Sequence, residues 1–274
     1  MPKFGNHLIK ILKSLDFSRL FNFNKIKIYN FTFKNEWMMD VTTIMQTLKS
    51  LGTEQTKKTH IQHGAPADTT YGVKVGDLIT IVKQIKKNHE LAIELYDTGN
   101  SDAMYLAGLI GDEKKMTKAD FNRWAKNATW NMHSEYTIPF VAAESPLGWQ
   151  IALDWINSKE EKIATAGWNT LSLVISYLPD EQLDKKQIES LLKRIQKEIH
   201  GAENRIQYTM NGFVISVGTY IPSLLEKAKK TALAIGKIKV EMGETACKIP
   251  FAMDYIEKIE KKGMVGNKRK STRC

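Results

Sequence analysis

Cysteine is nearly absent from this chain of 274 residues, which contains only Cys247 and the terminal Cys274. Two cysteines can form neither a disulfide scaffold nor a four-ligand zinc site by themselves. Such a low content is typical of the reducing cytoplasm, where we expect this protein to act. Long apolar runs are absent as well. No segment approaches the ~18 uninterrupted apolar residues of a membrane-spanning helix, so we expect no membrane association.

Motifs of the common nucleotide-binding and hydrolytic enzymes are also missing. The sequence has no G-x-x-x-x-G-K-[ST] phosphate loop, and no G-x-G-x-x-G follows a predicted strand. It has no G-x-S-x-G elbow, and Cys247 has no nearby histidine to activate it as a nucleophile. His60 and His63 lie three residues apart without acidic or sulfur ligands around them, so we expect no metal site and no cofactor.

What the chain does contain is enough apolar residues to fold and a positive charge that is concentrated at its two ends. The apolar fraction of 42% can bury a core. Of the net charge of +10, residues 1–37 contribute seven basic and two acidic side chains, and residues 221–274 contribute thirteen and six. The 183 residues between them therefore have a net charge of −2. This uneven distribution favours a polyanionic partner such as nucleic acid.

The spacing of apolar residues predicts helix after helix, joined by short turns. Residues 188–199 carry apolar side chains at i, i+3, i+4, i+7 and i+11, and residues 206–217 carry a second such stripe. The β-branched residues of Phe213–Ile221 are compatible with a strand, but the helical spacing that runs into them favours a helix. Helix pairs recur at about 30–40 residues, which predicts an all-α, repeat-like fold.

Short polar side chains predict where three of these helices begin. Asn100 precedes the apolar stretch 103–110 and is a typical N-cap residue. Thr117 with Asp120 three residues later, and Ser158 with Glu161, have the spacing of capping boxes.

Composition divides the chain into three parts. Residues 1–37 are basic and irregular in pattern, and we expect them to form an extension outside the fold. Residues 38–262 carry the helical patterns and form the predicted repeat domain. Residues 263–274 are basic and follow glycines, so we expect a flexible tail that contacts phosphates.

Aromatic residues supply the first candidates for a binding site. Five of the six tryptophans lie between residues 124 and 168. Trp124 and Trp130 flank a polar turn, and Trp168 follows a glycine, so an exposed ring at one of these positions could stack on a base. Packing between helices is the alternative role for these rings. His133 lies among polar residues near Trp130 and is the candidate functional histidine.

The sequence also contains a set of short runs that recur together in one known family. In this combination they resemble the DNA alkylation repair family over about residues 39–274. The resemblance implies a curved stack of HEAT-like helical repeats whose concave face holds duplex DNA. It includes the AlkD-type glycosylases, which remove positively charged alkylated purines. The runs are His63–Ala65, Tyr71–Leu78, Glu90–Ala92, Leu95–Asn100, Asp102–Ala103, Leu106–Gly108, Ala246–Lys248 and Gly266–Lys270.

The chain departs from the AlkD-type pattern at the residues that the resemblance makes catalytic. Those enzymes have a tryptophan followed four residues later by an aspartate, whereas Trp130 is followed by Ser134, with Glu135 one residue further. Their W-L-R-R element corresponds to Ala166–Asn169, which contains no arginine. Losing the carboxylate and the arginine would remove most of the stabilisation of the departing sugar cation. Glu135 is the candidate catalytic residue if its side chain reaches the concave face.

Two functions are therefore open from the sequence. The first is a monomeric DNA-binding protein that contacts the backbone of duplex or branched DNA and excises or senses alkylated bases as an N-glycosylase. The second is a non-enzymatic helical-repeat scaffold for branched DNA or a protein partner, which the −2 charge of the middle region favours. The candidate DNA-binding residues are Trp124, Trp130, His133, Ser134, Trp168, Asn169, Lys227, Lys229, Lys230, Lys268, Arg269, Lys270 and Arg273.

Overall fold

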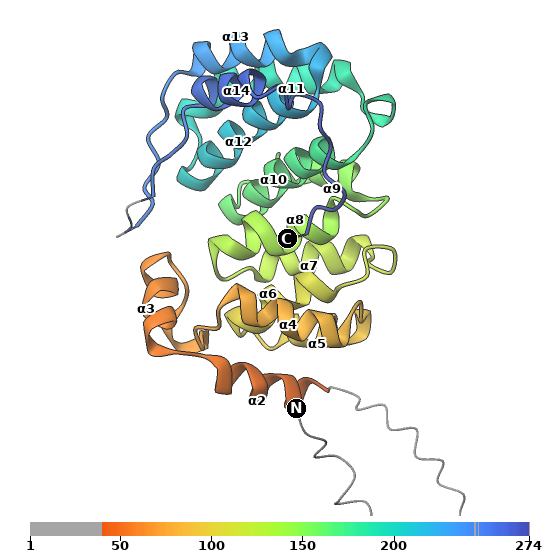
Figure 1. Cartoon of the computed structure of the whole chain (residues 1–274), viewed down its shortest axis with the longest axis vertical. Coiled ribbons are helices and arrows are strands. Elements are labelled where there is room, and N and C mark those ends of the chain that lie inside the picture. The colour runs from red at the N-terminus through yellow and green to blue at the C-terminus, as the bar shows by residue number, and fades with distance from the viewer. Residues whose placement is uncertain (1–39, 244, 246, 274) are drawn as a thin grey trace, which may run out of the picture. The chain divides into compact units, whose positions relative to one another are not determined.

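Residues 40–243, 245 and 247–273 are described by the computed structural model, and in this part of the chain the regular elements are all helices. The extension expected at residues 1–37 lies outside the described residues. Figure 1 shows the helices from α2 to α13 following one another in chain order. The predicted all-α fold is confirmed. The helices are α2 (Val41–Leu51), α3 (Glu54–Gln62), α4 (Val75–Ile85), α5 (His89–Asp97), α6 (Ser101–Ile110), α7 (Lys118–Asn127), α8 (Ile138–Ala142), α9 (Gly148–Trp155), α10 (Glu161–Tyr177), α11 (Lys185–Glu198), α12 (Asn204–Tyr220), α13 (Leu225–Ile235) and α14 (Ala252–Lys261), with a π-helical turn η3 (His133–Thr137) before α8.

Two of the three predicted helix starts are confirmed. The Asn100 side chain accepts hydrogen bonds from the backbone N–H groups of Asp102 and Ala103, so it caps α6. Thr117 and Asp120 form a complete capping box at the start of α7, in which each side chain accepts from the backbone of the other. Both caps satisfy N–H groups that the first turn of a helix leaves without an internal partner.

The capping box predicted from Ser158 and Glu161 is wrong. Helix α10 begins at Glu161, and Glu160 is its N-cap residue without a side-chain cap. Ser158 instead accepts a hydrogen bond from the backbone N–H of Glu160 at 3.1 Å, and it lies two residues before the N-cap position. Serine often bonds the backbone two residues ahead in this way, and that local bond competes with capping.

Helices α6, α10 and α12 form the centre of the core. Every residue of α6 is buried, α10 packs against α9 and α12, and α12 packs against α13 and α14. The segment Phe213–Ile221, for which a strand was the alternative, is helical up to Tyr220 as predicted. Its Phe213, Val214 and Val217 side chains are fully buried, because their helical spacing turns them towards the same core.

Trp124 and Trp168 are core residues, so the expectation that either ring is exposed for base stacking is wrong. Both side chains are fully buried. The Trp124 ring stacks on Tyr96 with centroids 4.2 Å apart, and the Tyr96 hydroxyl donates to the Trp124 carbonyl at 2.8 Å. The Trp168 ring meets Phe213 edge-on at 5.4 Å. Large aromatic side chains fill the space between packed helices, and both Trp124 and Trp168 have this role.

The basic C-terminal segment is held against the helices and is not the flexible tail that the sequence predicts. Figure 1 shows it running down from α14 to end beside α8. The Arg269 backbone N–H donates to the Ser176 carbonyl at 2.8 Å. The Lys268 ammonium donates to the Ile175 carbonyl at 2.8 Å and pairs with Asp180 at 2.9 Å.

The last residues of this segment are buried at the ends of two earlier helices. Thr272 is fully buried, and its hydroxyl donates to the Phe140 carbonyl in α8 at 2.7 Å. Arg273 pairs with Glu113 at 2.8 Å, and both side chains are about one-tenth exposed. Carbonyl groups at the carboxyl end of a helix have no partner inside it and carry partial negative charge. The basic segment supplies both the donors and the positive charge that these ends require.

We expect Arg273→Ala to lower the free energy of unfolding by about 1–3 kcal/mol, because it removes a charged hydrogen bond and leaves Glu113 buried with one partner fewer. Urea unfolding followed by circular dichroism measures the loss. The control is Lys270→Ala at an exposed position, which should change the free energy by less than about 0.5 kcal/mol. Equal effects of the two substitutions would contradict the docked arrangement.

Candidate nucleic-acid interface

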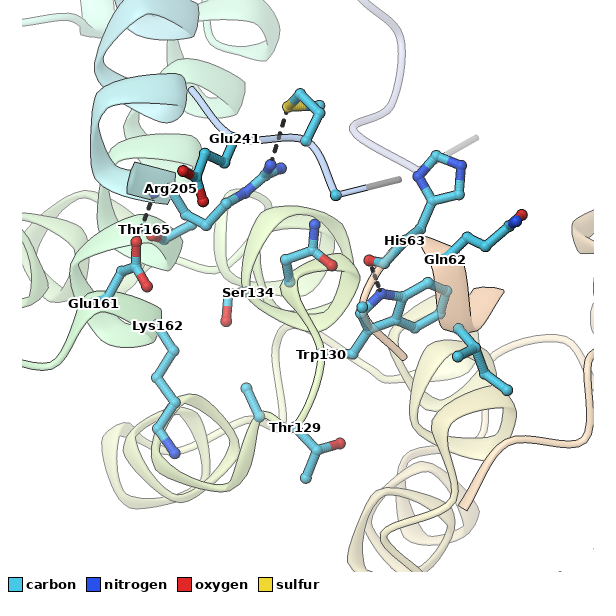
Figure 2. Close-up of a pocket in the computed structure, with 16 residues that line it drawn as sticks. Gln62, His63, Thr129, Trp130, Ser134, Glu161, Lys162, Thr165, Arg205 and Glu241 are labelled. Atoms are coloured by element: carbon cyan, nitrogen blue, oxygen red, sulfur yellow. Dashed lines mark hydrogen bonds between the residues drawn. The ribbon is translucent and has the colours of Figure 1, made fainter. Parts of the chain in front are cut away.

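A cavity of about 760 Å³ lies where the amino-terminal ends of α10 and α12 meet the end of α3. Figure 2 shows its side chains, with Ser134 between Lys162 and Trp130. The turn before η3 contributes one part of the lining, and residues 241–243, which follow α13, contribute another. The lining residues are Ile61, Gln62, His63, Gly64, Ala128, Thr129, Trp130, Asn131, Ser134, Glu161, Lys162, Thr165, Arg205, Glu241, Met242 and Gly243.

Trp130 is the one candidate tryptophan of the three that lines this cavity. Its indole N–H donates to the His63 carbonyl at 2.8 Å, which ties it to the end of α3. The His60 ring lies against it with centroids 5.2 Å apart. Trp130 is only 8% exposed. Most of its ring is therefore packed against neighbouring residues, and only a small part is open to the cavity.

His133 is buried and does not line the cavity, contrary to the expectation that it contacts DNA. Its Nε2 lies 3.1 Å from the Ser101 carbonyl, to which it donates, and its Nδ1 lies 3.5 Å from the Thr129 hydroxyl. Burial lowers the pKa of His133 to about 4, because the charged ring would lose its hydration. The neutral side chain joins η3 to α6.

The π-helical turn η3 decides how Ser134 and Glu135 face. The Ile138 backbone N–H bonds to the His133 carbonyl, five residues back, so one residue is inserted relative to a regular helix. Ser134 lines the cavity and Glu135 does not. The Asn169 side-chain amide of α10 donates to the Glu135 carbonyl and thereby fixes this turn against α10.

The Glu135 carboxylate forms a buried ion pair with Arg205 at the first turn of α12. The Arg205 Nε donates to Glu135 Oε1 at 2.5 Å, and a terminal nitrogen of the same guanidinium pairs with that oxygen as well. The carboxylate side chain is 3% exposed and the guanidinium side chain 14%. Burial raises the pKa of Glu135 to about 7, and Arg205 limits the rise. The carboxylate thus faces a cation of the protein and not the space in which a substrate would lie.

Arg205 is the central residue of the site that sequence reasoning missed. Its guanidinium lies over the Tyr208 ring at 4.7 Å, and its backbone N–H donates to the Glu161 carboxylate at 2.6 Å. Glu135 and Arg205 are separated by 70 residues along the chain. Neither helical spacing nor a local motif connects them, and they come together because η3 and α12 both pack against α10.

The predicted basic residues lie outside the cavity. Lys227 pairs with Glu189 at 2.5 Å, Lys229 pairs with Glu260 at 2.7 Å, and Lys230 is exposed on α13. The predicted Lys268, Arg269, Lys270 and Arg273 belong to the docked C-terminal segment.

A different lysine, Lys162, lines the cavity and donates to the Lys126 carbonyl at 2.5 Å. Among the described residues, no three His, Cys, Asp or Glu side chains come together in a group that could hold a metal ion. No described helix is both long and apolar enough to cross a bilayer.

Comparison with known proteins gives a consistent set of similarities. A family model described as "DNA alkylation repair enzyme" matches residues 44–248. Protein Lin0241 of Listeria innocua is 36% identical over 216 residues, which cover 77% of this chain and 93% of that protein. Protein Lmo0209 of Listeria monocytogenes matches with the same identity and the same coverage.

One solved structure has a TM-score of 0.80 and 37% sequence identity, and the match covers 86% of this chain and 100% of that chain. It is described as "a new family of proteins related to the HEAT-like repeat DNA glycosylases with affinity for branched DNA structures". The predicted HEAT-like helical-repeat fold is therefore confirmed.

We expect His133 to make the protein less stable as the pH is lowered from about 6.5 to 4. The unfolded ring binds a proton at its ordinary pKa of 6.5, whereas the folded ring resists protonation down to about 4. This difference corresponds to roughly 3 kcal/mol. Urea unfolding of wild type and of His133→Gln at both pH values measures the effect, since the comparison cancels the contributions of other groups. The difference in the free energy of unfolding between wild type and His133→Gln should shrink by about this amount between pH 6.5 and pH 4.

The matched control for this experiment is His200→Gln at an exposed position, which should track the wild type at both pH values. A wild type and a His133→Gln variant with the same pH dependence would show that the buried ring is not held in its neutral form.

Proposed function

Because the chain belongs to the DNA alkylation repair family, as its sequence motifs predicted, we propose that it binds DNA through the sugar–phosphate backbone, prefers branched DNA, and does not excise bases. The observation that carries the proposal is the match at 37% identity along the full length of a structure described as having affinity for branched DNA. The proposal transfers that affinity to this chain as the property to be tested.

Binding through the backbone is supported by the groups around the cavity. The amino-terminal ends of α10 and α12 both line it, and such ends attract phosphate through their N–H groups and positive partial charge, although the Arg205 N–H of α12 is already bound by Glu161. Lys162 adds a cation at the same rim. These groups carry no means of reading base sequence, so the proposed recognition is of DNA shape and charge.

The state of Glu135 supports the absence of base excision. A catalyst that releases a cationic purine needs an anion directed at the sugar, where positive charge develops. The Glu135 carboxylate is bound by Arg205 and does not line the cavity, and Ser134 cannot supply a negative charge. Arg205 would place positive charge where the transition state also gains it, which opposes the reaction.

The alternative function is a scaffold that binds a protein partner. The net charge of −2 over residues 38–220 favours it, because a DNA-binding face normally gains affinity from basic residues. The same binding experiment separates the two functions.

For the proposed function we expect fluorescence anisotropy to show tighter binding of a four-way junction than of a duplex of equal length. The logarithm of the binding constant should fall linearly with the logarithm of salt concentration, because each contacted phosphate releases about 0.9 counterions. Lys162→Glu should weaken binding of both DNAs to a similar degree and reduce the slope by about 1.

The control for charge reversal is Lys186→Glu, an exposed residue of α11 that does not line the cavity and should leave the binding constants unchanged. No affinity for any of these DNAs at ~50 mM salt would overturn the DNA-binding function and favour the protein scaffold.

For base excision we expect that a duplex containing 7-methylguanine releases the base at the same rate with the protein as in buffer, because the site lacks a carboxylate directed at the sugar. Chromatographic detection of the free base measures the rate, and an AlkD-type glycosylase is the positive control. If wild type released the base faster than buffer and Glu135→Gln did not, the Glu135 side chain would be shown to be catalytic.

A further inference from the structure

We propose that Arg205 is the residue that binds a DNA phosphodiester in the cavity and that Glu135 is its positioning residue. The inference rests on the proposed DNA-binding function and adds the chemistry of the contact. It means that the charged group offered to a ligand here is a cation facing a phosphate, while the Glu135 carboxylate is bound within the protein.

The hydrogen bonds of Arg205 leave part of its guanidinium for a ligand. Its Nε and one terminal nitrogen are directed at the Glu135 carboxylate. The other terminal nitrogen donates to the Met242 thioether sulfur at 3.2 Å. A thioether is a weak acceptor. A phosphate oxygen that replaced it would turn this contact into a charge-assisted hydrogen bond, which is roughly twice as strong as a neutral one.

The surroundings of Arg205 are rich in donors. Lys162 has only the neutral Lys126 carbonyl as an acceptor among the described residues. Ser134 and Thr165 line the same cavity, are 2% and 1% exposed, and have hydroxyl oxygens without a hydrogen-bond partner in the described structure. Buried hydroxyl groups normally form a hydrogen bond, so the missing partner of these two is consistent with a ligand that binds in the cavity. A phosphate group offers several acceptor oxygens to such a set.

The amino-terminal end of α12 already holds an anion. The Glu161 carboxylate accepts from the Arg205 backbone N–H at 2.6 Å, and α12 has no side-chain cap of its own. The Glu160 cap position of α10 likewise lacks a side-chain cap. The end of α12 is therefore shown to accept a carboxylate, and the neighbouring end of α10 is open to one more oxygen.

Two carboxylates limit which phosphate fits. Glu161 and Glu241 both line the cavity and repel added negative charge. A phosphodiester carries one negative charge, whereas free phosphate and phosphate monoesters carry about two near neutral pH. The singly charged DNA backbone is therefore the better match.

Glu135 positions Arg205 by fixing the plane of its guanidinium. The carboxylate is itself fixed, because the Asn169 amide binds the carbonyl of the same residue and anchors η3. The Tyr208 ring supports the guanidinium from one side at 4.7 Å. With both contacts in place, the terminal nitrogen of Arg205 that does not bind Glu135 lies on the side of the cavity.

The test compares variants that share a charge. Arg205→Gln should weaken binding of the four-way junction about 10-fold or more at low salt and reduce the salt slope by about 1. Glu135→Gln and Glu135→Ala both remove the carboxylate charge, but only the amide oxygen of the first can still accept from Arg205. We therefore expect Glu135→Ala to bind about 10-fold more weakly than Glu135→Gln.

Circular dichroism and the urea midpoint check that each variant is folded. Arg205→Lys, which keeps the charge, replaces Arg205→Gln if that variant does not fold.

The contacted phosphate is located with junctions in which single linkages are neutral methylphosphonates. At one linkage near the branch, the neutral substitution should weaken wild type by the same factor as Arg205→Gln and have no further effect on that variant. Arg205→Lys should retain the salt slope with reduced affinity, because the charge remains and the fork is lost.

The outcomes separate the inference from the function on which it rests. Wild type that binds no DNA would overturn the proposed function. Wild type that binds, while Arg205→Gln keeps the same affinity and slope, would overturn the role of Arg205 alone. Equal binding by Glu135→Ala and Glu135→Gln would overturn the positioning role. Inorganic phosphate that displaces DNA from wild type at constant ionic strength, but not from Arg205→Gln, would identify free phosphate as the ligand instead.

Discussion

The structure depends on one constraint, which is that each α-helix leaves N–H groups at one end and carbonyl groups at the other without internal partners. In this stack the amino-terminal ends of α10 and α12 meet at the cavity, and the carboxyl ends of α8 and α10 meet the C-terminal segment. The dipoles of these helices therefore favour anions on one side and cations on the other. The Glu161 carboxylate lies at an amino-terminal end, and the basic C-terminal residues lie at carboxyl ends, as these dipoles favour.

The same constraint bears on Glu135, the catalytic candidate of the sequence analysis. A site that stabilises a sugar cation must present to it a carboxylate that no other charge of the protein compensates. Here the Glu135 carboxylate is compensated by Arg205 within the protein. The converging helix ends favour an anion, and because Glu135 is compensated, the anion that the proposed function brings to them is a phosphate of the bound DNA.

Local patterns predicted much of the fold because helices and their caps are specified by nearby residues. The stripes in 188–199 and 206–217 and the caps at Asn100 and Thr117 all depend on side chains within about one or two turns. The site was predicted less well, since its features join distant segments. A sequence pattern does not show that Trp124 fills the space beside Tyr96, nor that Arg205 reaches Glu135 across 70 residues. The motif around Trp130 lies at the cavity, and the packing of distant segments sets the contacts of each residue there.

The docked C-terminal segment changes how this repeat protein holds together. In a simple helical array each unit contacts only its neighbours, so stability is nearly a sum of local terms and loss of one end leaves the rest intact. Here Arg273 bonds to Glu113, 160 residues earlier in the chain. That contact closes a long loop and adds to the other long-range contacts of the fold, such as the one between Glu135 and Arg205. During synthesis the helices between these two residues emerge before Arg273 does, so the contact that joins the two regions forms only after Arg273 has left the ribosome.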